Sequence, residues 1–292
     1  MASSKDLRKR ISTVKNTQQI TKAMKMVSAA KLRRAQDAIV SLRPYAREIQ
    51  AIVSSIARST EAAHPLMDEA RAESGDKVLV VVVTSDRGLC GAFNASVIKG
   101  AMRYMRTHGH NYKKFELGFV GRKGYEFFKT RTPNAGRYYQ NFFSGLRFAK
   151  SQAMAEELIA QYTAGDFDQV FFVYNEFQSA ISQKVAVERF LPVRIEGAGT
   201  ETAGDQNPVA YEPSREEILD MLLPKHFATQ IHRILLESLA SEHGARMSAM
   251  ENATKNAGEM MFALSLEYNK TRQGGITKEL LEIVSGSEAQ KN

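Results

Sequence analysis

Apolar side chains recur at alternating intervals of three and four positions over the first sixty residues of the chain. Such a 3.5-residue period forms the seam of a left-handed coiled coil, and no glycine precedes Gly75. The seam positions are Leu7, Ile11, Val14, Gln18, Thr21, Lys25, Ser28, Leu32, Ala35, Ile39, Leu42, Ala46, Ile49, Val53 and Ile56. This pattern predicts one long helix over residues 4–59, with a kink or local break at Pro44, and a second helix that covers its seam.

The seam changes character between residues 18 and 28, where its own positions become polar. The apolar residues of this stretch lie beside the seam instead, and they are Ile20, Met24 and Val27. Lys22 and Lys25 flank them. An apolar stripe at helical spacing is more often core than anything else, and a cation-ringed surface for an acidic partner is the alternative.

The middle of the chain alternates between strand and helix patterns. Residues 78–83 are apolar on both faces, as in a buried parallel strand. Further strands are expected at residues 115–121, 169–175 and 183–192, the last as a hairpin partner, and helices at residues 92–107, 125–129 and 149–162. This order predicts a small Rossmann-like α/β layer.

A second long helix is expected near the end of the chain. Residues 214–217 read Ser-Arg-Glu-Glu, a capping box, and apolar or small residues then recur in threes and fours to about residue 284. The expected domains are residues 1–59 (first helix), 60–76 (linker), 77–195 (α/β domain), 196–213 (connector) and 214–292 (second helix). The fold class is thus mixed: a long antiparallel coiled coil with an inserted Rossmann-like α/β domain, its second helix projecting beyond the first.

Charge is concentrated at the start of the 292-residue chain, whose total net charge is +8. Residues 1–58 contain thirteen Lys and Arg and three Asp and Glu, a net charge of +10, which favours an acidic surface as partner. The longest strongly apolar run, residues 78–83, is far too short to cross a bilayer, which takes roughly 20 residues. A single cysteine, Cys90, excludes an internal disulfide and fits a reducing compartment.

Candidate catalytic chemistry is weak throughout the sequence. The Gly88–Gly91 turn between a strand and a helix could hold a phosphate, but it lacks both nucleotide-binding glycine patterns, so a tight structural turn is favoured. A small buried thiol is favoured for Cys90 over a nucleophile. The spacing of the histidines fits no metal site, and Asp86, Glu156, Glu157 and Glu176 fall in different elements. We therefore expect no catalytic residue, cofactor or metal.

Five segments together resemble the gamma-subunit family of F-type ATP synthases. They are residues 11–34, which include Thr-Lys-Ala-Met-Lys-Met-Val-Ser-Ala-Ala-Lys, residues 84–94, which include Ser-Asp-Arg-Gly-Leu-Cys-Gly, and residues 246–258, 268–273 and 276–286. The resemblance covers nearly the whole chain in order. Two positions depart from the family pattern, namely Ser287 in place of alanine and Val209 in place of an aromatic residue.

This resemblance implies a central rotor shaft inside a ring of three alpha and three beta subunits, with ATP chemistry on beta. The foot would bind epsilon and the membrane c-ring, and proton or sodium flow would turn the shaft. Family motifs assign ring contacts to Lys22, Met24, Lys25, Arg246, Gln273, Thr277, Glu279 and Glu282, and c-ring or epsilon contacts to Tyr211 and Glu212. No residue receives a catalytic role.

The expected location is the cytoplasmic face of a bacterial inner membrane, where the chain is peripheral through the c-ring. Two functions other than that of a rotor shaft would each explain part of the sequence. A nucleic-acid binder would explain the basic helix, but residues 1–44 contain no aromatic side chain for base stacking. A Rossmann-type enzyme would explain the middle of the chain, but no cofactor fingerprint is present.

Overall fold

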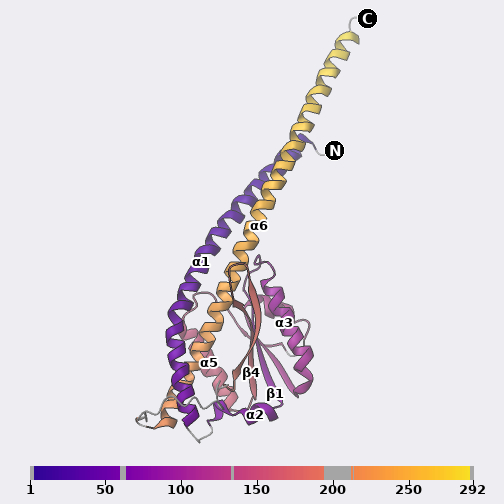
Figure 1. Ribbon diagram of the computed structural model, residues 1–292. Helices are drawn as coiled ribbons and strands as arrows, with labels where there is room; N and C mark the ends of the chain where they lie inside the picture. The colour runs from indigo at the N-terminus through magenta and orange to yellow at the C-terminus, as the bar shows by residue number, and fades with distance from the viewer. Residues whose placement is uncertain (1–2, 60–63, 133–134, 194–211, 213, 290–292) are drawn as a thin grey trace. The chain divides into compact units, whose positions relative to one another are not determined.

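The computed structural model describes residues 3–59, 64–132, 135–193, 212 and 214–289 (Figure 1). The chain forms two compact units. Unit 1 combines Met1–Ser28 with Arg246–Asn292, and unit 2 comprises Ala29–Ala245. Residues 29–59 and 215–245, which belong to the two long helices, are therefore in the same unit as the α/β layer. The boundaries expected at residues 59, 76, 195 and 213 stay a prediction.

The two expected long helices are α1 (Ser4–Ser59) and α6 (Arg215–Ala289). All fifteen seam positions of α1 are buried or partly buried, so the prediction of the seam is confirmed. The expected break at Pro44 is absent, because the helix continues through it. Proline removes the hydrogen bond to the carbonyl of residue 40, and since Val40 is exposed, water can bond that carbonyl. One of the two hydrogen bonds of the expected capping box is present: Ser214 Oγ accepts a hydrogen bond of 3.2 Å from the Glu217 amide, so Ser214 caps α6.

Unit 2 is built on one five-stranded sheet in the order β3-β2-β1-β4-β5. The strands are β1 (Lys77–Val83), β2 (Lys114–Val120), β3 (Ala135–Tyr139), β4 (Gln169–Phe177) and β5 (Gln183–Leu191). All neighbouring pairs are parallel except β4 and β5, which form the expected hairpin. The Rossmann-like layer is thus confirmed, although β3 was not predicted.

Helices cover both faces of this sheet, because β1 directs alternate apolar side chains to opposite sides. Val78, Val80 and Val82 pack with residues of α3 (Phe93–His108) and α4 (Arg122–Phe128). Leu79, Val81 and Val83 pack with residues of α5 (Phe148–Thr163), α6 and the C-terminal part of α1. Figure 1 shows α3 on one side of β1 and β4, and α5 and α6 on the other.

The segment expected to be a linker contains regular structure of its own. A short 3₁₀ helix, η1 (Pro65–Met67), is followed by α2 (Glu69–Ser74), and a second 3₁₀ turn, η2 (Gly109–Asn111), follows α3. Asp68 caps α2 by accepting a hydrogen bond from the Arg71 amide at 3.2 Å. The Arg71 side chain in turn pairs with Asp168 at 3.2 Å, so α2 is anchored to the start of β4.

Unit 1 is an antiparallel pair of helices. As the residue number in α1 rises from Gln18 to Lys25, that of its partner in α6 falls from Thr254 to Glu251. Tyr268 and Thr271 are the last partly buried residues of α6, and every side chain from 272 to 287 is exposed. These sixteen residues span roughly 24 Å at 1.5 Å per residue, so α6 projects beyond its partner as expected.

Candidate protein-interaction surface

The polar stretch of the seam in unit 1 is a layer of hydrogen bonds between the two helices. The hydroxyls of Thr21 and Thr254 lie 2.8 Å apart, and Gln18 Nε2 donates to the Thr254 carbonyl at 3.4 Å. Lys25 Nζ forms an ion pair of 2.6 Å with Glu251. Thr21 and Ser28 are both buried. Polar residues of α1 therefore pair this helix with α6 here.

The displaced apolar residues consequently point away from the partner helix. Ile20 is 60% exposed and Val27 is 57% exposed, while Met24 is partly buried. Lys22 beside them is exposed and forms no ion pair within the described residues. The core interpretation of this stripe is wrong for Ile20 and Val27, because α6 covers the seam and leaves the next face of α1 uncovered. We call Ile20, Lys22, Met24 and Val27 the α1 docking face.

The projecting end of α6 carries four of the family-assigned residues. Gln273, Thr277, Glu279 and Glu282 are all exposed, and Glu282 pairs with Lys278 one turn earlier at 3.7 Å. Exposed apolar side chains form a stripe along one side of this segment, namely Ile276, Leu280, Leu281, Ile283 and Val284. An apolar stripe of this kind normally packs against another surface, so this segment has the surface of a helix that contacts another protein.

The remaining family-assigned residues have different surroundings. Arg246 is 7% exposed, so its guanidinium group is largely covered within the chain. Glu212 is exposed, whereas Tyr211 lies outside the described residues. The structure thus brings Lys22, Met24 and Lys25 together on α1 and the four α6 residues together on the projecting segment, and it places Arg246 with neither group on the surface.

The turn after β1 is held by side-chain hydrogen bonds. Asn94 Oδ1 accepts from the Ser85 amide at 2.9 Å, and Ser85 Oγ donates to the Arg87 carbonyl at 2.5 Å. Cys90 is buried, and Asn94 Nδ2 lies 3.2 Å from its sulfur. Leu89 adopts a positive φ of 63° with an exposed side chain. These contacts make the segment after β1 a structural turn with a buried thiol.

No metal-binding constellation forms among the described residues. No group of three or more His, Cys, Asp and Glu residues there could hold a metal ion. His108 stacks on Tyr104, with ring centroids 4.5 Å apart, and His232 bonds Ser151 at 2.9 Å. Across the described part of the chain, no helix is both long and apolar enough to cross a bilayer.

Sequence reasoning missed a partly buried cluster of charges around Arg233 in unit 2. Its guanidinium group bonds Glu188 on β5 and Glu237 one turn further along α6, the latter at 3.3 Å. Tyr174 on β4 donates to Glu188 at 2.7 Å. Burial opposes the charge of Arg233, but Glu188 outweighs it and raises the pKa of the guanidinium group. The sequence signal for this cluster was the i, i+4 spacing of Arg233 and Glu237. The same spacing is equally typical of an exposed helix face, so it does not indicate a cluster.

Comparisons with known proteins agree over almost the full length of the chain. A family model described as ATP synthase matches residues 3–290. The ATP synthase gamma chain of Anaeromyxobacter dehalogenans is 51% identical over 293 residues, covering 99% of this chain and all of that protein. The ATP synthase gamma chain of Geotalea uraniireducens is 47% identical over 292 residues, covering both chains completely.

Solved structures with a similar fold come from mitochondrial ATP synthases. A chain of the central stalk and c-ring structure from Tetrahymena thermophila is 29% identical with a TM-score of 0.59, covering 80% of this chain and 99% of that one. A chain of the Euglena gracilis OSCP/F1/c-ring structure in rotational state 3 is 25% identical with a TM-score of 0.68, covering 98% of this chain and 94% of that one.

Proposed function

The chain belongs to the ATP synthase gamma-chain family, and from this premise we propose that it is the rotating central shaft of an F-type ATP synthase. The observation that carries the proposal is the projecting end of α6, which is exposed from residue 272 to 287 and has an uncovered apolar stripe along one side. Burial of such a segment stabilises a complex by roughly 25 cal/mol per Å² of apolar surface. It therefore fits the apolar bearing of an enclosing ring of alpha and beta subunits.

The α1 docking face supplies the second proposed contact with that ring. Its lysine, Lys22, has no ion pair within the described residues, whereas Lys25 is paired with Glu251 at the edge of the same surface. We infer that Lys22 meets an acidic segment of the passing beta subunits and that Met24 fills an apolar contact beside it. Lys25 would exchange between Glu251 and that acidic segment as the shaft turns.

A shaft of this kind acts through differences in contact free energy. Its docking face lies on one side of α1, so each beta subunit meets a different surface at each angle of rotation. A ligand or partner shifts a conformational equilibrium only by its differential affinity for the states. The shaft would thus select the conformation of each beta subunit in turn, and the chemistry of ATP synthesis or hydrolysis would remain on beta, with no catalytic residue in this chain.

The second family contact region is proposed to act on the same ring. Gln273, Thr277, Glu279 and Glu282 can reach a partner directly, since all four are exposed. Arg246, which is largely covered, would contribute by holding α6 in place or by a change of its own contacts on assembly. These roles rest on motif matches and on exposure.

The foot of the shaft is proposed to bind the epsilon subunit and the membrane c-ring. Glu212 is exposed and, with Tyr211, matches the family's contact with the c-ring. The chain would then be peripheral to the membrane, on the cytoplasmic face of a bacterial inner membrane, in line with its bacterial relatives. Proton or sodium flow through the c-ring would drive the rotation.

Rotation can be observed directly because the chain offers a clean labelling position. Ile181 lies in the β4–β5 turn of unit 2 and is 84% exposed, whereas the single native cysteine, Cys90, is buried. A probe attached to Ile181→Cys should therefore label one site. The unsubstituted chain, which retains Cys90, is the labelling control.

With the alpha and beta ring fixed to a surface, we expect this probe to turn in one direction when ATP is added. Removal of residues 272–292 should weaken the bearing and reduce the torque. ATP hydrolysis by the fixed complex without any rotation of the probe would contradict the proposed function.

A further inference from the structure

Unit 2 contains a cavity of about 510 Å³ where α1, β5 and α6 meet. This volume lies within the range of roughly 300–1,000 Å³ that small-molecule sites occupy. The cavity belongs to neither of the proposed ring contacts, since all its lining residues lie between positions 39 and 237 and within one compact unit.

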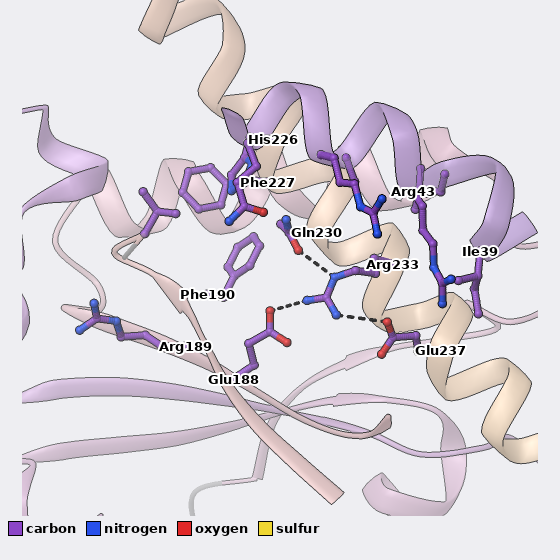
Figure 2. A pocket seen from close by; sticks show the side chains of 15 residues that line it. Ile39, Arg43, Glu188, Arg189, Phe190, His226, Phe227, Gln230, Arg233 and Glu237 are labelled. Carbon is purple, nitrogen blue, oxygen red and sulfur yellow. Dashed lines mark hydrogen bonds and ion pairs between the residues drawn. The ribbon is translucent and has the colours of Figure 1, made fainter. Parts of the chain in front are cut away.

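The two ends of the cavity differ in chemistry (Figure 2). Phe190 of β5 and Phe227 of α6 form one end, with ring centroids 5.0 Å apart in an edge-to-face arrangement, and His226 lies beside Phe227 at 5.7 Å. Figure 2 shows these three rings together, Arg43 at the opposite end, and Gln230 and Arg233 between them. An aromatic end and a cationic end thus face the same space.

The arginines of the lining divide into paired and unpaired groups. Arg233 is bound by Glu188 and Glu237, and Arg189 pairs with Glu69. Arg43 and Arg47 lie one turn apart on α1, both are exposed, and neither forms an ion pair within the described residues. Four arginines and two glutamates give the lining a positive balance. Two unpaired guanidinium groups on one helix face match the geometry of a carboxylate or phosphate.

His226 adds an unsatisfied polar atom to the aromatic end. The residue is 4% exposed, and its Nδ1 has no hydrogen-bond partner. Burial, and then the charge of Arg233, lower the pKa of His226 to about 4, so the ring is neutral at physiological pH. Buried polar atoms without partners are uncommon, because each costs about 1–3 kcal/mol. The aromatic end of the cavity therefore includes a neutral imidazole ring with an unsatisfied nitrogen.

We propose that the cavity binds a small organic anion, whose ring or short alkyl body lies against Phe190 and Phe227 and whose carboxylate or phosphate bonds Arg43 and Arg47. A compact inorganic anion would leave the aromatic end empty, and a neutral ring would leave both guanidinium groups unpaired. The occupant would contact α1, β5 and α6 together, so binding would stabilise the packing of residues 39–50 of α1 against the sheet. This inference concerns unit 2 alone and does not depend on the proposed shaft function.

Chemical protection of the two arginines tests the proposal in the assembled complex. Phenylglyoxal modifies accessible guanidinium groups, and mass spectrometry of the digested chain reads each site separately. We expect phenyl phosphate at saturation to slow modification of Arg43 and Arg47 at least about fivefold, because a guanidinium group held in a charge-assisted pair is not free to react. Arg33 and Arg34, exposed on the same helix but outside the cavity, are internal controls whose rates should not change.

Three results of this experiment would overturn the proposal. Equal protection of all four arginines would show non-specific binding of anions to a basic helix. Protection by inorganic phosphate as strong as that by phenyl phosphate would show that the aromatic end contributes nothing. Complete resistance of Arg43 and Arg47 in the ligand-free complex would show that another protein covers the opening.

A matched pair of variants tests the same site by affinity. Binding of 4-fluorophenyl phosphate to the full-length chain is followed by fluorine magnetic resonance. Arg43→Gln combined with Arg47→Gln should weaken binding about tenfold or more, because each substitution removes a hydrogen bond between a charged guanidinium group and the anion. Arg33→Gln combined with Arg34→Gln, which removes the same charge from the same helix, should leave binding unchanged. Equal weakening in both double variants would contradict a defined site.

Discussion

The two halves of α1 follow one heptad pattern but use it differently. Residues 29–59 bury an apolar seam, in which Ile49, Val53 and Ile56 join the large core beneath the sheet. Residues 18–28 instead pair with α6 through polar side chains, and Ile20 and Val27 of this stretch face outward, whereas Leu7 nearer the N-terminus is buried. The same period therefore gives a fixed attachment in one part of the helix and an available surface in residues 18–28.

This difference shows where stability and interaction separate along one helix. Burial of apolar side chains supplies most of the stability of a helix in water, so residues 29–59 need no partner protein. Residues 18–28 use hydrogen bonds, whose net contribution is only about 1 kcal/mol each. Ile20 and Val27 of this stretch remain on the surface, so the comparison predicts that equal substitutions in the two parts of α1 have unequal effects.

The largest expected effect comes from truncating the same residue type in each half. Ile56→Ala removes a fully buried side chain and should lower the free energy of unfolding by about 2–5 kcal/mol. Ile20→Ala removes a side chain that is 60% exposed and should change stability by less than about 0.5 kcal/mol. Thermal unfolding of the full-length chain, followed by circular dichroism, measures both. A similar loss in the two variants would remove the distinction between the halves.

Acid should weaken unit 2 selectively, because its buried His226 titrates differently in the folded and unfolded chains. The pKa of about 4 lies below the ordinary value of 6.5, so the unfolded chain binds the proton first as the pH falls. Stability is therefore lost between about pH 6.5 and 4, by at most roughly 1.4 kcal/mol per pH unit. Unit 1 contains no histidine.

The measurement compares urea unfolding of the wild-type chain and of His226→Gln at several pH values across that window. Other groups titrate too, including Glu237, whose pKa burial raises, so the difference between the two curves is the informative quantity. We expect the wild type to lose more stability than the variant on acidification. Parallel curves would show that His226 does not carry this effect.

A smaller effect on stability is expected from the layer of hydrogen bonds between α1 and α6 in unit 1. The hydroxyls of Thr21 and Thr254 lie 2.8 Å apart, so Thr21→Val or Thr254→Val alone should cost about 1 kcal/mol. The double variant should cost less than the sum, by about 0.5–1 kcal/mol, because both hydroxyls then leave together. A double-mutant cycle on unfolding free energies gives this coupling. Strict additivity would mean that the two hydroxyls do not interact.

Much of the fold was predictable from periodicity alone. The seam of α1, the all-apolar strand β1 and the helix cap at Ser214 are local patterns with one structural solution, and the structure bears out all three. The short strand β3 was missed because residues 135–139 include Gly136 and Arg137 and lie at the edge of the sheet. An edge strand makes few apolar contacts, so its sequence carries little periodic signal.

The surfaces were less predictable than the fold, because exposure depends on what the rest of the chain covers. The spacing of Ile20, Met24 and Val27 favours a core interpretation over a docking surface until the position of α6 is known. The Arg233 cluster has the same difficulty, since Glu188 is 45 residues away in sequence. Helix α2 was missed because Asp68 caps it within a segment that contains His64, Pro65 and Gly75.

The central claim is that the α1 docking face acts on a partner and not on the chain's own stability. Met24→Lys adds a cation to this face and should form or strengthen an ion pair with an acidic beta segment, holding some rotary angles more tightly by about 1 kcal/mol or less. Met24→Leu is the size-matched control without added charge. Neither substitution should prevent assembly, because Met24 is only partly buried.

The most direct measurement is the number of ions pumped per ATP hydrolysed in membrane vesicles that contain the reconstituted complex. We predict a lower ratio for Met24→Lys at nearly normal ATP hydrolysis, and an unchanged ratio for Met24→Leu. An unchanged ratio in Met24→Lys, or an equal loss in both variants, would contradict the assignment of this face to the rotary contact.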